Sequence, residues 1–572
     1  MEYSAIFHDM DKRFCYAIDK DLFVIRVQVK KDDMKEVILH YEDKYIPMER
    51  KDTRMTLPMK KVATSQFHDY YEAQLRMNLI CLRYFFEFTD MQGEKVYYGN
   101  YEFDKECITN RDRMFDCPQN LREEEMFEVP QWAANKVVYQ IFPSRFAATQ
   151  PVDKELWYKA PITPMDDLHG NLRGIIEHLD YIKDLGIDVV YLTPIFKSNS
   201  CHKYDTIDYY QVDPSFGTTE DLKELVQKSH ERGMKVVLDA VYNHTGREFF
   251  AFQDILEKGE KSKYLDWYFI DELPPKSEWG EIPNFKCFGY YGGMPKLNLK
   301  NPEVEKYITD VACYWIKECD IDGWRLDVGD EISHFFWKNF RKAIKAVKKD
   351  MLIIGEIWHY AGDFLEGDEW DTVMNYPFYL NLIDLLADEK INVSQFVQNL
   401  GYLKGRLNKK CYPLMWNLID SHDTARFLHL CNDNKKKQHL AAAFQLLLPG
   451  MPMVYYGDEY AMPGANDPDC RRGMYWDEEY QDKEMFEWYK RLLQVRKAHT
   501  CIVEGELAEA ITRDEDETIV LIRKNGEETI ALIFNCSDHT KEFKEYAQKQ
   551  DLLTEKVFDG KVEAFDAAVI VL

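Results

Sequence analysis

The residues best suited to chemistry in this sequence are acidic and stand where short apolar runs end. Asp327 lies near the end of the run at residues 321–328, and Arg325 precedes it by two positions. Side chains on a strand alternate between its two faces, so these two point the same way. A cation beside a carboxyl group keeps that carboxyl ionised. Taken alone, the pair fits a structural ion pair as well as a functional one.

Two further carboxylates downstream favour a functional interpretation. Glu356 follows the apolar run at residues 351–354 and precedes Trp358, a dry setting that favours the protonated form. Asp423 follows another strand candidate. A retaining glycosidase needs an ionised nucleophile and a protonated acid about 5 Å apart. We therefore predict Asp327 as nucleophile and Glu356 as acid, with Asp423 gripping the sugar hydroxyls and favouring ring distortion.

Two histidines stand near these strand ends. His244 closes the string that begins with Asp239, and His422 directly precedes Asp423. A lone histidine is more often a satisfied structural residue than a functional one. Beside three strand-end carboxylates, both are predicted to donate hydrogen bonds to sugar hydroxyls near the broken bond.

The elements that must position these residues alternate between strand and helix from residue 136 onward. Apolar runs at 137–142, 189–192 and 236–239 alternate with helical patterns, such as the one at 172–185 that stops at Gly186. Repeated βα units imply a parallel sheet. Their number and the chain length favour a closed (β/α)₈ barrel, and no glycine-rich dinucleotide fingerprint follows the first strand. In such a barrel, function sits at the C-terminal strand ends.

The rest of the chain divides by pattern. Residues before the barrel alternate as half-buried strands do, and Asn525-Gly526 after it is a strong hairpin signal. A long aromatic stretch inside the barrel breaks its rhythm. The predicted domains are an accessory β-sandwich for carbohydrate binding or dimerisation (1–117), a linker (118–133), the barrel (134–500) with an inserted subdomain (246–299) after its third strand, and a C-terminal β-sandwich (501–572).

The charge and composition of the chain argue against several classes of binding partner and location. The net charge of -27 argues against nucleic acid and anionic membranes, whereas a neutral sugar needs no charge complement. The N-terminus opens no signal-peptide pattern, and no run is apolar enough to span a bilayer. The 13 cysteines are odd in number and contain no C-x-x-C pair, which is typical of reduced thiols in a cytoplasm.

Several short strings in the sequence resemble those of a known protein family. The strings at 239–244, 323–327, Glu356 and 421–423 are similar to the signature regions of the α-amylase family of glycoside hydrolases. Met294-Pro295-Lys296-Leu297-Asn298 resembles the extra signature of its neopullulanase, cyclomaltodextrinase and maltogenic amylase branch. The strings at 202–206 and 467–472 also resemble that branch, and the likeness runs in order from about residue 130 to 476.

The resemblance implies roles for individual residues. It implies Asp327 as nucleophile, Glu356 as acid/base and Asp423 as transition-state stabiliser, with Tyr204 stacking on the sugar at the cleavage point. It further implies a glycone side lined by His202, Arg325, Asp467 and Arg471, and an acceptor side lined by Phe288, Trp358 and Tyr376. For these aromatics the alternative is core packing. Glu331 is implied to influence whether water or sugar accepts the glycosyl group.

One departure concerns metal. Many relatives carry a calcium site just after the first barrel strand, but the stretch at 146–153 holds two alanines and a valine. Calcium prefers a cluster of oxygen ligands, and only Asp153 and Asn171 remain. We expect no metal and no cofactor. The relatives' N-terminal domain implies a homodimer with a narrowed cleft.

The sequence thus predicts a retaining hydrolase of α-1,4-glucosidic bonds in cyclodextrins, maltooligosaccharides or pullulan. A glucosyltransferase or isomerase of the same family is an alternative, because a covalent glycosyl-enzyme can be taken by sugar instead of water. A catalytically silent glycan-binding protein is a remote alternative, since all three catalytic carboxylates are present.

Overall fold

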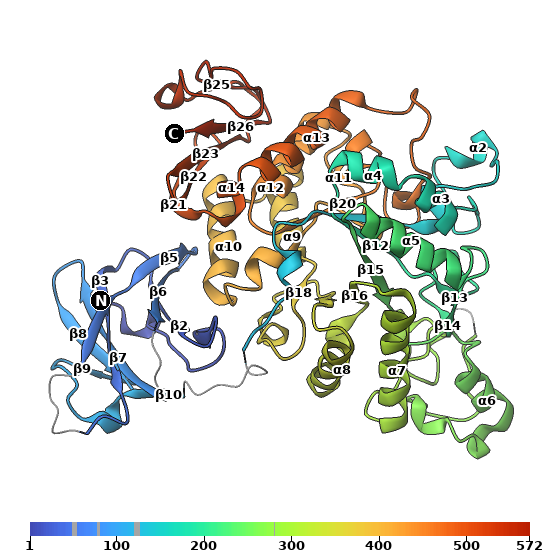
Figure 1. The fold of residues 1–572 in the computed structure, drawn as a ribbon, viewed down its shortest axis with the longest axis horizontal. Helices are drawn as coiled ribbons and strands as arrows, with labels where there is room; N and C mark the ends of the chain where they lie inside the picture. The colour runs from blue at the N-terminus through green and yellow to red at the C-terminus, as the bar shows by residue number, and fades with distance from the viewer. Residues whose placement is uncertain (48–53, 77–79, 119–125, 279–280) are drawn as a thin grey trace. The chain divides into compact units, whose positions relative to one another are not determined.

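A computed structural model describes residues 1–47, 54–76, 80–118, 126–278 and 281–572 (Figure 1). The chain forms two compact units. The first comprises Met1–Glu128 with Tyr360–Asp368 and Ile391–Tyr412, and the second comprises Val129–His359, Glu369–Lys390 and Pro413–Leu572. No helix within the described ranges is both long and apolar enough to cross a membrane.

The first unit contains two antiparallel sheets. One has the order β1-β2-β6-β5 and the other the order β4-β3-β7-β8-β9, with β10 beside β7. Residues of both sheets, among them Val27, Val29, Phe86 and Phe88, form one buried core, as in a β-sandwich. The strands are β1 (Cys15–Ala17), β2 (Leu22–Lys30), β3 (Met34–Asp43), β4 (Met55–Pro58), β5 (Lys60–Thr64), β6 (His68–Arg76), β7 (Cys81–Asp90), β8 (Lys95–Gly99), β9 (Glu102–Asp104) and β10 (Phe115–Pro118).

A helix from the predicted barrel region belongs to this first unit. Helix α10 (Val393–Arg406) packs on β5, and the buried Arg26 of β2 donates to the carbonyl oxygens of Gly405 and Leu407, both at 2.9 Å. Arg26 also pairs with Glu72 at 2.9 Å. Strand β2 is therefore buried on both faces, which strict alternation did not predict. Of the predicted linker, residues 119–125 lie outside the described residues.

The second unit is built on the predicted barrel. Eight parallel strands follow the order β18-β17-β16-β15-β12-β11-β20-β19, and a parallel bridge between Met374 and Trp416 joins the two ends of this sheet. The (β/α)₈ fold is thereby confirmed. The strands are β11 (Val138–Ile141), β12 (Val189–Leu192), β15 (Lys235–Ala240), β16 (Gly323–Leu326), β17 (Leu352–Gly355), β18 (Thr372–Val373), β19 (Trp416–Asn417) and β20 (Met451–Tyr455).

Helices flank these strands, and their ends follow local rules. Helix α5 (Thr219–Glu231) starts with a capping box between Thr218 and Asp221, and α7 (Pro302–Cys319) starts after its N-cap Asn301 with proline in its first turn. Figure 1 shows α5, α7 and α8 (His334–Val347) beside β12, β15 and β16. Helices α12 (Lys435–Leu447) and α13 (Lys483–Ala498) lie later in the chain.

The helix predicted at 172–185 is in fact two helices, α3 (Leu172–Glu177) and α4 (Leu179–Leu185). His178 separates them with φ -106° and ψ 10°. Its Nδ1 is 2.7 Å from the Gly174 carbonyl oxygen, and its ring packs 4.1 Å from the Trp476 ring. The local bond to Gly174 and the long-range contact with Trp476 favour a break that the hydrophobic period alone did not show.

The aromatic stretch after β15 contains a helix, α6 (Phe250–Lys258), that its pattern did not reveal. Phe249 occupies the N-cap position and provides no side-chain hydrogen bond, so the usual start signal is missing. Isolated bridges such as His244 with Lys296 tie this subdomain back to the end of β15. At the C-terminus, β21 (Glu506–Arg513), β22 (Thr518–Asn525), β23 (Glu528–Asn535) and β26 (Asp566–Val571) form the predicted β-domain, with β24 (Lys541–Glu542) paired to β25 (Lys561–Val562).

Candidate active site

The C-terminal ends of three neighbouring strands place three carboxyl groups around one arginine. Arg325 of β16 is fully buried, and its Nη1 donates to both Asp239 oxygens at 3.1 Å and to Asp327 Oδ1 at 2.9 Å. Its Nη2 lies 2.8 Å from Glu356 Oε1, an ion pair without the alignment of a good hydrogen bond. The parallel register explains the meeting, because Asp239 and Arg325 are direct partners across β15 and β16.

The third predicted carboxylate joins the same cluster. Asp423 Oδ2 is 3.9 Å from Arg325 Nη2 and 3.1 Å from His422 Nε2, and its Oδ1 is 3.4 Å from Arg471 Nη2. Arg471 Nη1 in turn pairs with Asp467 at 2.8 Å. The predicted carboxylates therefore lie around a single guanidinium, although they come from distant parts of the chain.

Electrostatics in this cluster favour retention of a proton. Burial raises the pKa of Asp327 well above its usual range and also raises the pKa of Glu356, while the Arg325 charge opposes the shift in both. Burial likewise raises the pKa of Asp239 to about 6 against the same arginine. One cation cannot neutralise this many carboxylates, so the cluster can hold a proton that an exposed carboxyl would have lost.

The two central carboxyls differ in their hydrogen bonds. Asp327 Oδ1 accepts from Arg325, whereas its Oδ2 is buried and has no partner in the part of the chain that the structure describes. Both Glu356 oxygens accept N–H groups, Oε2 from the Val328 backbone at 2.8 Å and Oε1 from Trp358 Nε1 at 3.2 Å. Asp327 thus keeps one oxygen without a donor, while Glu356 is fixed in orientation.

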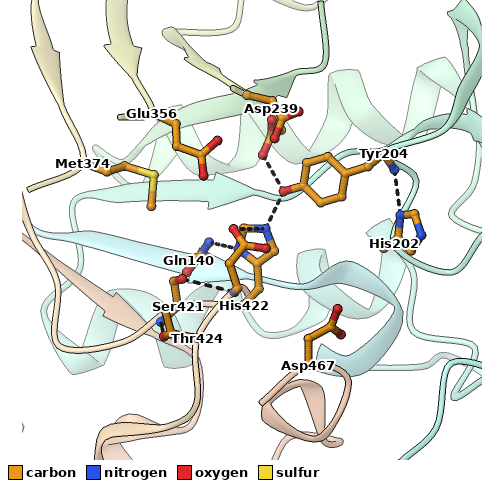
Figure 2. Close-up of polar contacts among 12 residues, drawn as sticks. Gln140, His202, Tyr204, Asp239, Glu356, Met374, Ser421, His422, Thr424 and Asp467 are labelled. Atoms are coloured by element: carbon orange, nitrogen blue, oxygen red, sulfur yellow. Dashed lines mark hydrogen bonds and ion pairs between the residues drawn. The ribbon is translucent and has the colours of Figure 1, made fainter. Parts of the chain in front are cut away.

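Tyr204 and His422 form a stacked pair beside the carboxylates (Figure 2). Their ring centroids are 5.6 Å apart and their planes differ by 4°. The Tyr204 hydroxyl contacts His422 Nε2 and lies 3.2 Å from Asp239 Oδ2. His202 Nδ1 accepts the Tyr204 backbone N–H at 3.1 Å, and burial lowers the pKa of His202. His202 thereby fixes the loop that carries Tyr204.

The structure gives His244 a different partner from the one the sequence predicted. Its Nε2 is 3.1 Å from the Tyr204 carbonyl oxygen, and its ring stacks on Phe288 with centroids 5.1 Å apart. Burial lowers the pKa of His244 to about 3, so the ring is neutral. Its Nε2–H is therefore committed to the backbone in this structure, where we predicted a donor to the sugar.

The aromatic residues predicted for the acceptor side form two groups. Trp358 is 41% exposed and stacks face to face on Tyr376, with centroids 4.0 Å apart. Tyr376 is fully buried, so its ring packs against one face of Trp358 and is not accessible for stacking on a sugar. Phe288 is 36% exposed and lies in the inserted subdomain. Trp358 and Phe288 are thus the side chains of this set with surface available for stacking.

Three residues at the site escaped the sequence analysis. Tyr191 of β12 donates its hydroxyl to Asp239 at 2.6 Å, and Met374 Sδ is 3.4 Å from Arg325 Nε. Gln140 of β11 lies 2.7 Å from His422 Nδ1. Gln140 could have been recognised as a candidate because it is a polar residue inside an otherwise apolar strand. Nothing in the sequence marked Tyr191 or Met374.

Asp153 and Asn171, the two oxygen ligands that remain where relatives bind calcium, cap helices here. Asp153 Oδ1 accepts the Glu155 N–H at 3.0 Å at the start of α2 (Lys154–Trp157), and Asn171 Oδ1 accepts the Gly174 N–H at 2.9 Å. Among the described residues, no group of three or more His, Cys, Asp or Glu side chains is arranged to hold a metal ion.

Fold and site together define an enzyme of the TIM-barrel class with a carboxylate centre. Residues 140–505 match the family model for the α-amylase catalytic domain, and residues 1–119 match that for the α-amylase N-terminal Ig-like domain. The chain therefore belongs to the α-amylase family, and it is an α-glucan hydrolase of that family.

Individual relatives agree with this assignment. A cyclomaltodextrinase of Geobacillus thermopakistaniensis (strain MAS1) is 42% identical over 546 residues, covering 95% of this chain and 92% of the relative. An intracellular maltogenic amylase of Bacillus subtilis is 38% identical over 543 residues, covering 94% and 91%. A solved cyclomaltodextrinase structure covers 100% of both chains with a TM-score of 0.94 and 36% identity.

Proposed function

We propose that this enzyme hydrolyses α-1,4 bonds of cyclodextrins and short maltooligosaccharides by double displacement. The observation that carries the proposal is the gathering of Asp327, Glu356 and Asp423 around the buried Arg325. Two relatives with nearly full coverage are named cyclomaltodextrinase, which supports the substrate class.

The first displacement breaks the glycosidic bond. With the cluster's proton on Glu356 and Asp327 ionised beside Arg325, Asp327 Oδ2 attacks the anomeric carbon while Glu356 gives its proton to the leaving oxygen. Oδ2 accepts no hydrogen bond from the described residues. Arg325 and the buried surroundings hold Asp327 in place, and Asp423 accepts hydrogen bonds from the ring hydroxyls. A covalent glycosyl ester on Asp327 results. A linear substrate releases its shortened glucan as a neutral alcohol, whereas an opened cyclodextrin keeps the new hydroxyl at the far end of the same glucan chain.

The second displacement releases the sugar. Glu356, now ionised, removes a proton from water, and the resulting oxygen attacks the anomeric carbon, so that Asp327 leaves as a carboxylate. Two inversions retain the α configuration. The exposed Trp358 can hold a sugar at the point from which water attacks, so glucosyl transfer competes with hydrolysis when sugar is abundant.

A product profile tests this function. β-Cyclodextrin, pullulan and starch are digested side by side at equal mass, with and without excess glucose. We expect β-cyclodextrin to be opened fastest, giving α-configured products, with transfer products appearing only when the acceptor is in excess. Products dominated by transfer at every acceptor concentration would favour the glucosyltransferase alternative, and starch degraded fastest would contradict the substrate class.

The remaining parts of the proposal concern the cellular location, the oligomeric state and the need for calcium. All 13 cysteines are free thiols, and the B. subtilis relative is named intracellular, which together support a cytoplasmic location. A homodimer formed through the N-terminal domain, expected from the resemblance, is measurable by sedimentation velocity. The helix caps made by Asp153 and Asn171 support catalysis without calcium, so EDTA should leave kcat/KM unchanged.

A further inference from the structure

Gln140 is a buried polar side chain with an active-site partner. It lies on β11 between Tyr139 and Ile141, in a strand whose residues are all buried, and none of its surface is exposed. Its Nε2 is 2.7 Å from His422 Nδ1 (Figure 2). Burying an amide costs free energy unless it is hydrogen-bonded. Its contact with His422 is therefore the feature that needs an explanation.

The contact decides which nitrogen of His422 carries the proton. A neutral imidazole has one N–H and one acceptor nitrogen. If Gln140 donates through Nε2, His422 Nδ1 is the acceptor and Nε2 carries the hydrogen. If the amide is reversed, Nδ1 carries the hydrogen and Nε2 becomes an acceptor.

The neighbours of His422 Nε2 favour the first arrangement. Asp423 Oδ2 lies 3.1 Å away, and a lone pair on Nε2 would face that carboxylate oxygen unfavourably. With the hydrogen on Nε2, this contact is attractive, and the Tyr204 hydroxyl is free to donate to Asp239 at 3.2 Å. The single Nε2–H is then shared between Asp423 Oδ2 and the Tyr204 hydroxyl oxygen, while Tyr204 donates its own hydrogen to Asp239.

We propose that Gln140 is a positioning residue that holds His422 as its Nε2–H tautomer, directing that hydrogen toward Asp423 and the sugar hydroxyl bound there. The mechanistic value of this hydrogen rests on the proposed function, because Asp423 is the carboxylate that grips the sugar. The tautomer itself is a property of the free protein and can be measured without substrate.

Burial, helped by nearby arginines, lowers the pKa of His422 and keeps the ring neutral, so the choice of tautomer matters. Burial lowers the pKa of His422 well below its usual range, and Arg471, Arg325 and His202 lower it further. Asp423 and the Tyr204 hydroxyl face Nε2, while Arg471 Nε donates to the His422 carbonyl oxygen at 2.8 Å. A ring that stays neutral at working pH relies on one fixed hydrogen.

The first experiment records ¹⁵N shifts of histidine-labelled protein, with His422 assigned by its loss in His422→Asn. We expect a protonated Nε2 and an unprotonated Nδ1 in the wild type. Gln140→Met keeps the size of the side chain without the donor, and should mix the two tautomers and lower kcat/KM by about 10-fold, by analogy with residues that orient a metal-binding histidine. A wild-type Nδ1–H signal, or an unchanged signal in Gln140→Met, would overturn the proposal.

A second variant inverts the hydrogen bond. In Gln140→Glu the introduced carboxylate accepts from Nδ1–H, which leaves Nε2 as a lone pair facing Asp423 and should lower kcat/KM by about 100-fold at neutral pH. One added proton, taken by either the introduced carboxylate or His422, restores Nε2–H. The variant should therefore regain activity relative to the wild type as pH falls. A constant activity ratio across pH would contradict the assigned role.

The matched control is Gln445→Met. Gln445 of α12 is also fully buried, and its Nε2 donates to the carbonyl oxygens of Asn417 and Met453. This variant should lose stability in thermal unfolding while leaving the His422 ¹⁵N signature intact. If glucan hydrolysis itself proved wrong, the tautomer measurement would still decide the role of Gln140.

Discussion

The aspartates at the two ends of strand β16 have opposite environments and opposite pKa shifts. Asp322, directly before the strand, accepts from Lys235 at 2.9 Å, Lys348 at 3.1 Å, His230 at 2.6 Å and the Val236 N–H at 3.0 Å. Burial raises its pKa, but these partners outweigh burial and lower the pKa to about 2. Asp327, directly after the strand, shares one arginine with other carboxyls, and burial raises its pKa.

The arrangement at the first end recurs around the barrel. Asp371, before β18, accepts from Arg341 at 2.7 Å, Lys345 at 2.8 Å and the Ile353 N–H at 2.9 Å. In each case the aspartate before one strand binds the backbone of the strand next to it and is surrounded by cations. These ends stabilise the barrel, whereas the opposite ends retain unneutralised negative charge that catalysis can use.

The largest expected effect is on activity. Asp327→Asn removes the nucleophile and should lower kcat by about 10⁴-fold or more, as when the nucleophile of other covalent enzymes is replaced. The change also removes a negative charge from an overcrowded cluster, so the midpoint of thermal unfolding should stay level or rise. Steady-state kinetics and calorimetry on the same preparation test both parts. A large fall in stability would contradict the contrast between the strand ends.

The converse variant acts on stability. Asp322→Asn removes the buried carboxylate that Lys235 and Lys348 share, leaving Lys348 paired with the exposed Asp320, and should lower the free energy of unfolding by about 3 kcal/mol. At temperatures where the variant stays folded, kcat/KM should be unchanged. The control is Asp320→Asn two residues earlier, where the side chain is 71% exposed and the expected change is within about 0.5 kcal/mol. Equal destabilisation by both variants would show that the buried ion cluster contributes little.

The smallest expected effect is a difference in pH dependence: stability from Asp322 and activity from Asp327 should be lost at different pH values. Asp322 has a lowered pKa in the folded state, so its contribution to stability is complete above about pH 4, the unfolded pKa, and is lost as pH falls toward about 2. Asp327 has a raised pKa, so its nucleophilic form is lost at higher pH. On acidification kcat/KM should fall while circular dichroism still reports a folded protein. Loss of kcat/KM and of the folded circular-dichroism signal at the same pH would contradict the contrast between Asp327 and Asp322.

Much of the site was predictable because it is encoded locally. Asp327, Glu356 and Asp423 each follow an apolar strand, Arg325 lies within one, and parallel strands present their C-terminal ends at one edge. Helix starts at Thr218 and Asn301 were likewise readable from capping residues. In both cases a few neighbouring residues carry enough information.

What remained hidden depends on contacts between distant segments. The role of Gln140 comes from a residue 282 positions away, and the placement of α10 in the first unit comes from Arg26 binding backbone carbonyls far along the chain. The break at His178 depends on the Trp476 ring in the same way.

The sequence by itself determined which side chains could do chemistry and which strands would carry them, because hydrophobic period and residue type are local properties. Only the tertiary structure decided how protons and hydrogen bonds are distributed among them. That His244 donates to a backbone carbonyl while His422 Nε2 faces a carboxylate follows from packing geometry, and no spacing along the chain encodes it.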